Sequence, residues 1–346
     1  MKKNLLFLCA ATAFAMACNK NKSISVTTYA GSGAIGGVNG KSTEASFSNL
    51  MGLAIDSAGN MYVADSRNNL IRKISAEGIV TTIAGSGNQG SADGKGIAAS
   101  FFFPAALAVD GQGIVYVADT HNSMIRKITP DGNVTTLAGR PDAETMDHPE
   151  AMVRFDNPYG IAIDKDGNVF VSDWDKDQIK KVSPDGKVSV YAGTGERGLK
   201  DGPAGTASFY LPEGIALDQK GNLYVADTYN NLIRKISPGG MVSTLAGRIK
   251  RGSANGKGAA ASFSHPDGIA VDKKGNVYVA DVGNNKIRKI TPDGMVSDFA
   301  GSGKRGADNG VALGATFYRP FGITIDNAGN LYVADYQNNL IRKVGK

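Results

Sequence analysis

The sequence predicts an all-β fold, a six-bladed β-propeller made of four-stranded antiparallel blades. Two observations carry this prediction: a sixfold internal repeat, and four short apolar runs inside each complete repeat. The aspartate of a Val-Ala-Asp or Val-Ser-Asp segment returns at a constant spacing, at Asp65, Asp119, Asp173, Asp227, Asp281 and Asp335. One such sheet cannot bury its faces alone, but six sheets packed in a ring can.

The unit between residues 212 and 247 gives the order of the predicted strands. They are the apolar runs at 214–218, 222–227, 232–237 and 241–247. Each run is rich in Val, Ile, Leu or Tyr and is bounded by Gly, Pro, Asp or Asn, which is typical of strands separated by tight turns. No segment between them shows the helical periodicity of a crossover helix.

Two sets of turns join these strands. Sequences of the type Asp-x-x-Gly-Asn, such as 218–222, follow the first strand, and Thr-Pro-Asp-Gly sequences, such as 291–294, follow the third. Glycine supplies the positive φ that such turns require, and proline presets the first turn residue. Because these turns vary little and share one face of the disc, we interpret that face as structural.

The last repeat ends after its third strand, and its fourth strand is predicted at the other end of the chain. Val-Thr-Thr-Tyr-Ala-Gly at 26–31 matches the fourth strand that begins at residue 80, which lies one full repeat further along the chain. The N-terminal strand is therefore predicted to complete the sixth blade and close the ring. The propeller is assigned to 25–346, with repeats near 52–86, 106–140, 160–194, 214–248, 268–302 and 322–346 plus 25–31.

The segment 1–17 is predicted to be an export signal, with Lys2 and Lys3 before an apolar run that ends in small residues. The sequence up to Cys18 resembles a bacterial lipoprotein signal, which implies that Cys18 is lipidated and that 18–24 form a tether. Ala15 stands where such signals usually have Leu, and the alternative is an ordinary signal cleaved after Ala17. We expect an exported, outer-membrane lipoprotein that faces the periplasm or the cell surface.

The repeats resemble the NHL repeat family. The resemblance rests on the pattern Pro-x-Gly-Ile-Ala-x-Asp followed by Gly-Asn-x-Tyr-Val-Ala-Asp and Ile-Arg-Lys, well preserved at 212–236 and 266–290. It covers essentially all of residues 25–346 and implies a six-bladed propeller. It does not imply one activity, because members include ligand sensors, RNA-binding and protein-binding modules, and metal-dependent lyases.

The predicted channel wall is apolar, so a functional site is expected at its mouth. The first strands contain Gly, Ala and branched aliphatic residues, with Thr324 as the one polar exception. The residues that lead into these strands differ among the six repeats, although the structural requirements at this position are the same in each. Such divergence among otherwise uniform repeats indicates a functional role. We predict a ligand site there, made by Tyr159, Glu213, His265, Asp267 and Arg319. The alternative is that these are ordinary solvated loop residues.

The predicted function is a binding or scaffold module without a cofactor. The alternative is a hydrolase or lyase, gluconolactonase-like or amidating-lyase-like, with one divalent metal ion held by Glu213, Asp267 and His265. The net charge of +6 includes an Arg-Lys or Lys-Lys pair in the third strand of every blade, where we expect ion pairs with aspartate. We therefore expect an envelope protein, a peptide or a carbohydrate as the partner, rather than nucleic acid, and a monomer.

Overall fold

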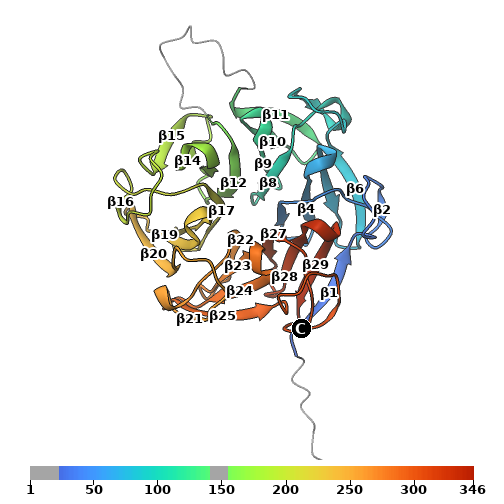
Figure 1. The fold of residues 1–346 in the computed structure, drawn as a ribbon. Helices are drawn as coiled ribbons and strands as arrows, with labels where there is room; N and C mark the ends of the chain where they lie inside the picture. The colour runs from blue at the N-terminus through green and yellow to red at the C-terminus, as the bar shows by residue number, and fades with distance from the viewer. Residues whose placement is uncertain (1–22, 141–154) are drawn as a thin grey trace, which may run out of the picture.

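The computed structural model describes residues 23–140 and 155–346, and they form a ring of six antiparallel sheets around a central channel (Figure 1). The predicted all-β propeller is confirmed. The predicted signal peptide and Cys18 lie outside the described residues. None of the described helices is long and apolar enough to cross a membrane.

Each blade is a meander whose first long strand lies innermost. Blade one contains β3 (Leu53–Ile55), β4 (Met61–Asp65), β5 (Leu70–Ile74) and β6 (Ile79–Ala84). Blade two contains β8 (Pro104–Val109), β9 (Val115–Asp119), β10 (Met124–Ile128) and β11 (Asn133–Gly139). Blade three contains β12 (Pro158–Ile163), β13 (Val169–Asp173), β14 (Gln178–Val182) and β15 (Val188–Ala192).

The second half of the ring repeats this order. Blade four contains β17 (Pro212–Leu217), β18 (Leu223–Asp227), β19 (Leu232–Ile236) and β20 (Met241–Gly247). Blade five contains β22 (Pro266–Val271), β23 (Val277–Asp281), β24 (Lys286–Ile290) and β25 (Met295–Ala300). Blade six contains β27 (Pro320–Ile325), β28 (Leu331–Asp335), β29 (Leu340–Gly345) and β1 (Ser25–Ala30).

Five of the six sheets carry a very short fifth strand that the sequence did not predict. These strands are β2 (Gly40–Lys41), β7 (Gly94–Lys95), β16 (Gly202–Pro203), β21 (Gly256–Lys257) and β26 (Gly310–Val311). Each belongs to the connection that enters a blade and pairs with the outermost long strand of a sheet. A short added strand protects an edge that would otherwise offer unpaired backbone groups. Such a strand is too short to show an alternating pattern.

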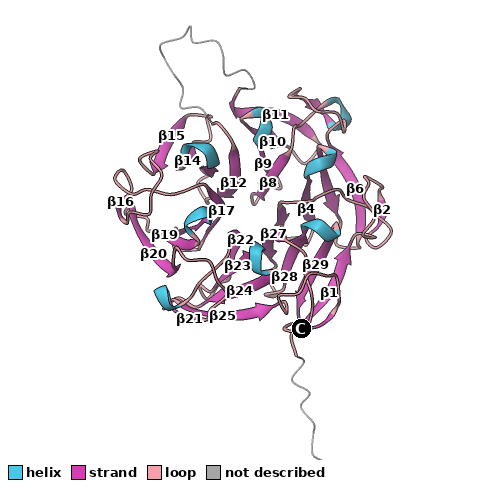
Figure 2. Cartoon of the chain, in the orientation of Figure 1, coloured by secondary structure: helices cyan, strands magenta, loops and turns pink. Residues whose placement is uncertain are grey.

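Short 3-10 helices follow the second strand of every blade and lie on one face of the disc (Figure 2). They are η1 (Ser66–Asn68), η3 (Thr120–Asn122), η4 (Trp174–Lys176), η5 (Thr228–Asn230), η7 (Val282–Asn284) and η8 (Tyr336–Asn338). Two others, η2 (Gly96–Ala98) and η6 (Gly258–Ala260), lie in blade connections.

A buried ion pair recurs in the core of every blade. The aspartate that ends the second strand binds an arginine of the third strand, as in Asp65–Arg72 at 2.7 Å and Asp227–Arg234 at 2.7 Å, with all four side chains fully buried. Blade three has Lys180 in place of arginine, paired with Asp173. The predicted pairing of the recurrent basic residues with aspartate is confirmed for the first residue of each basic pair.

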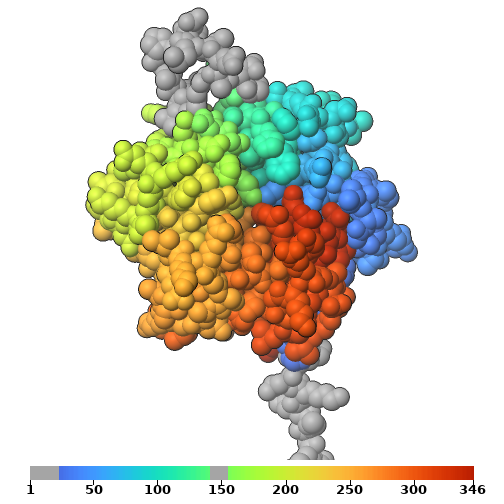
Figure 3. All heavy atoms as spheres, in the orientation of Figure 1, coloured from blue at the N-terminus to red at the C-terminus, as the bar shows by residue number. Residues whose placement is uncertain are grey.

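The predicted ring closure is also confirmed. The N-terminal β1 pairs antiparallel with the C-terminal β29, with Val26 opposite Val344. In the space-filling view, the blue start of the described chain lies against the red last blade (Figure 3). Val26 and Ala30 are fully buried, so this strand contributes to the core of blade six and to its boundary with blade one.

We predict that deletion of residues 24–31 destabilises the whole disc. The deletion removes the buried Val26 side chain, which alone contributes about 1.5–3 kcal/mol, and it leaves β29 as an open edge. The melting temperature of the deletion variant should therefore be well below that of a control chain that starts at residue 23. Equal melting temperatures for the two chains would contradict the closure.

Candidate functional site

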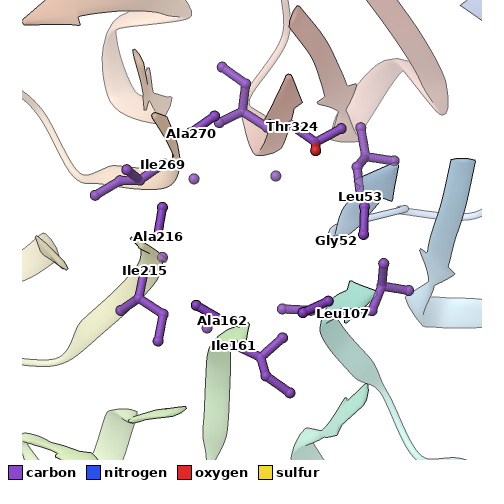
Figure 4. Close-up of a pocket in the computed structure, with 18 of the residues that line it drawn as sticks. Gly52, Leu53, Leu107, Ile161, Ala162, Ile215, Ala216, Ile269, Ala270 and Thr324 are labelled. Carbon is purple, nitrogen blue, oxygen red and sulfur yellow. The ribbon is translucent and has the colours of Figure 1, made fainter. Parts of the chain in front are cut away.

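The central channel has an aliphatic wall, as predicted. The inner strands line a channel of ≈ 290 Å³ with Gly, Ala, Val, Ile and Leu side chains. In the close-up, the hydroxyl of Thr324 is the one side-chain oxygen among the labelled residues (Figure 4). The aliphatic part of this wall offers no acid, base or metal ligand, and the ionisable residues of the channel lining, Tyr159 and Asp267, lie at the mouth.

The loops that lead into the inner strands are held in an unusual backbone conformation. Five of the six equivalent loop residues have a left-handed φ between 48° and 54°: Asn49, Phe103, Leu211, His265 and Arg319. Bulky side chains rarely adopt this conformation without support. Here each backbone N–H donates to a side-chain oxygen of the preceding blade, for example His265 to Asn231 at 3.0 Å and Arg319 to Asn285 at 3.0 Å. The blade-to-blade bonds therefore fix the positions from which His265 and Arg319 extend.

Tyr159, Glu213 and Asp267 form a contiguous polar cluster at the mouth. They occupy the same repeat position in blades three, four and five, where the other blades have Met51, Ala105 and Phe321. The Tyr159 hydroxyl donates to Asp267 Oδ2 at 3.4 Å, and the Glu213 and Asp267 carboxyl groups hydrogen-bond each other. Two carboxyl groups in such contact have to share a proton, because two adjacent negative charges repel each other.

Desolvation raises the pKa of all three groups of this cluster. Desolvation raises the pKa of Asp267 to about 7, and desolvation together with the charge of Asp267 raises the pKa of Glu213 well above its ordinary value. Desolvation and the same charge also hold the pKa of Tyr159 well above its ordinary value. The Thr228 hydroxyl and the Trp174 indole N–H favour the ionised form of Glu213, but burial outweighs them. At neutral pH the pair carries at most about one negative charge.

A hollow of ≈ 330 Å³ opens beside the carboxyl pair, between blades four, five and six. Its lining consists of Glu213, Thr228, Tyr229, His265, Val282, Gly283, Asn285, Arg305, Arg319 and Phe321. Of the five predicted site residues, Glu213, His265 and Arg319 line this hollow, while Tyr159 and Asp267 line the channel mouth. Glu213 joins the two groups, since it contacts Asp267 and also faces the hollow.

His265 lines this hollow. Burial lowers its pKa, and the positive charges of Arg251 and Arg319 lower it further. Its ring packs edge-on against Tyr229, with the ring centroids 5.5 Å apart. Arg305 lines the hollow, and Arg251 lies close enough to His265 to act on its pKa. Neither was among the five predicted site residues, but both belong to the basic segments 247–258 and 301–310, which the sequence predicts to lie on the mouth side and to attract an anionic ligand.

The predicted ligands do not form a metal-binding group. Among residues 23–140 and 155–346, no three His, Cys, Asp or Glu side chains gather closely enough to hold a metal ion. Glu213 and Asp267 hydrogen-bond each other, and His265 does not join them as a third ligand.

Family models match three parts of the chain. The NHL repeat model matches residues 209–236 and 263–290, which are the two repeats that carry Glu213, His265 and Asp267. A model described as the SMP-30/Gluconolactonase/LRE-like region matches residues 97–196. Together with the six blades, these matches confirm that the chain is an NHL-repeat propeller.

The curated relatives are much longer than this chain. The chloroplastic protein SUPPRESSOR OF QUENCHING 1 of Arabidopsis thaliana is 32% identical over 315 residues, which cover 84% of this chain and 30% of that protein. NHL repeat-containing protein 2 of Bos taurus is 29% identical over 334 residues, which cover 84% of this chain and 45% of that protein. The chain thus spans less than half the length of either relative.

Solved structures share the fold at low sequence identity. An auxiliary nutrient binding protein from Bacteroides ovatus superimposes with a TM-score of 0.71 at 16% identity, over 93% of this chain and 76% of that one. A gluconolactonase from Xanthomonas campestris gives a TM-score of 0.58 at 16% identity, over 87% of this chain and 86% of that one. These likenesses concern the propeller alone.

We predict that the carboxyl pair makes stability fall as the pH rises. A carboxyl group whose pKa is higher in the folded state binds its proton more tightly there, so the stability it contributes is lost between its ordinary pKa near 4 and about 7. Asp267→Asn cannot ionise, and its unfolding free energy should fall less steeply across this window. The difference in slope is at most about 1.4 kcal/mol per pH unit for one proton. It is measured by urea unfolding at pH 4 to 8.

Glu213→Gln, Asp267→Asn together should flatten the profile further, because the remaining raised carboxyl group is also removed. An Asp267→Asn profile parallel to that of the unmodified protein would contradict the assignment.

Proposed function

We propose that this protein is an exported, lipid-anchored binding propeller that holds a small ligand at the channel mouth over blades four to six. The observation that carries the proposal is the cluster of Tyr159, Glu213 and Asp267 beside an open hollow. Three neighbouring blades each contribute one polar side chain to it, at a repeat position where other blades have apolar residues.

The cluster is costly for the scaffold. Burying carboxyl groups away from water destabilises a fold unless each finds a partner, and apolar residues at the same position do not carry this cost. Met51 and Ala105 show that the position accepts apolar residues in blades one and two. The pKa values of these ionisable groups are raised, and the groups lie beside a hollow. Their presence is therefore better explained by ligand binding than by a structural role.

A carbohydrate or peptide fits this site better than nucleic acid. The first basic residue of each repeated pair forms a buried ion pair with aspartate, so it cannot contact the phosphates of a nucleic acid. The hollow has the size of a small-molecule site and is bordered by Tyr229 and Phe321, whose rings offer stacking surfaces. The nutrient-binding proteins with the same fold are consistent with such a role.

Hydrolysis is a second candidate function, and two observations favour it. A hydrogen-bonded pair of carboxyl groups with a raised pKa resembles an acid–base pair, and part of the chain matches the gluconolactonase-like family model. Hydrolysis of glucono-δ-lactone by the purified protein, lost in Glu213→Gln, would replace the binding proposal with this one.

We predict that the binding site can be detected with defined probes. Gluconate, glucuronate, glucose and trialanine are each added to the full-length protein, and at least one should raise the melting temperature. A ligand at 100 times its Kd adds about 2.7 kcal/mol of stability. Glu213→Ala should lower the affinity for that probe tenfold or more. Gln219→Ala, which lies in an exposed turn of the opposite face, should leave the affinity unchanged. Equal affinity of Glu213→Ala and the unmodified protein would exclude this site.

We also predict that Cys18→Ala releases the protein from membranes, because the mutant lacks the residue that would carry the lipid. The measurement is the distribution of the protein between the membrane and soluble fractions of cells. Cys9→Ala, which changes the other cysteine of the chain, serves as the control and should leave the protein attached. Unchanged membrane attachment of the Cys18→Ala protein would disprove lipidation.

A further inference from the structure

Blades four, five and six each place an arginine at the same position of their incoming connections, at Arg197, Arg251 and Arg305. The three arginines follow one another at the spacing of the repeat. Arg197 and Arg305 lie over equivalent tyrosine rings, Tyr210 at 5.1 Å and Tyr318 at 5.3 Å. The guanidinium groups of blades four and six are therefore presented by the same packing.

The three arginines differ in their acidic partner. Arg197 forms an ion pair with Asp177 at 3.3 Å. The residues equivalent to Asp177 in the next two blades are Asn231 and Asn285, and asparagine is the usual residue at this position of the repeat. Both asparagines keep the structural role of Asp177, since they accept the backbone N–H of the next blade, but they carry no charge.

The hollow consequently gathers positive charge without a counterion. Arg305 and Arg319 line it, and Arg251 lies close enough to His265 to lower the pKa of that imidazole. Within residues 23–140 and 155–346, none of these three arginines forms an ion pair with a carboxylate. Arg319 lies over the Phe321 ring at 5.6 Å instead.

The acidic residue of the hollow does not neutralise this charge. Glu213 is the one carboxyl group among the described lining residues, and desolvation together with the adjacent Asp267 raises its pKa well above the ordinary value, which favours the protonated form. A protonated carboxyl group donates a hydrogen bond and accepts others, which suits a hydroxyl group of a ligand. The hollow therefore combines guanidinium groups that have no acidic partner with a carboxyl group, that of Glu213, that can bind a hydroxyl group.

We propose that this hollow binds a small oxyanion, a carboxylate or phosphate group attached to a hydroxylated body. Arg305 and Arg319 bind the anionic group, because the planar guanidinium fork matches the oxygen atoms of carboxylate and phosphate. Glu213 binds a hydroxyl group of the body, and Tyr229 and Phe321 border it. This inference rests on the proposed binding function and names the chemical class of its ligand.

The test compares charged and neutral probes of similar size on the full-length protein. Gluconate, inorganic phosphate and glucose are titrated by calorimetry at low and at physiological salt. Gluconate or phosphate should bind at least tenfold more tightly than glucose, and more weakly as salt is added, because guanidinium–oxyanion attraction is screened.

Two matched variants locate the anion. The double variant Arg305→Gln, Arg319→Gln should lower the affinity for the anion tenfold or more. Arg197→Gln removes one charge from the equivalent position that has an acidic partner, and it should change the affinity less than twofold. The imidazole NMR signals of His265 should shift on titration in the unmodified protein and not in the double variant.

The outcomes separate the two proposals. If glucose binds as well as gluconate and only Glu213→Ala weakens both, the mouth site stands and the oxyanion class is wrong. If neither gluconate nor phosphate binds, or if Arg197→Gln weakens the anion as much as the double variant does, the oxyanion pocket is overturned.

Discussion

The buried pair of an aspartate and a basic residue is the interaction on which each blade depends. In blade one, Asp65 accepts the backbone N–H of Ser48, the side-chain amide of Asn68 and the guanidinium of Arg72. The same guanidinium donates to the carbonyl groups of Ser46 and Val38 in the incoming connection. One ion pair thus joins two strands to the loop that enters the blade. A buried charge without its partner is strongly destabilising, which explains why the spacing of these residues does not vary.

This constraint fixes the backbone of the mouth loops and leaves their side chains free to differ. The loop before each inner strand is held by the aspartate of its own blade and, in most blades, by an asparagine or aspartate of the preceding blade. These bonds use the backbone N–H groups of the loop, so they do not depend on the identity of its side chains. His265 and Arg319 can therefore occupy a position that Phe103 and Leu211 fill elsewhere without any change of fold. Such rigid support lowers the entropy cost of binding, because the groups are already in place.

Most of the fold was predictable because its information is periodic. One constant spacing assigns every long strand, and the match of 26–31 to the fourth strands predicts the closure of the ring. Tyr159, Glu213 and Asp267 were found as differences between equivalent positions, and the structure brings them together. The short fifth strands were missed, since they do not lie in the apolar pattern of the long strands. The shared proton was not predictable either. It depends on the approach of two carboxyl groups in neighbouring blades, which are one full repeat apart in the sequence.

The charge of the chain has a different meaning once the buried pairs are accounted for. A net charge of +6 predicts attraction to anions in general, yet a basic residue in every blade is neutralised inside the core. The balance differs locally, because Asp177 pairs with Arg197, whereas the equivalent Asn231 and Asn285 carry no charge. All three residues accept the backbone hydrogen bond that the scaffold needs. A repeat protein can thus change its local charge by substitutions that leave the scaffold hydrogen bonds in place.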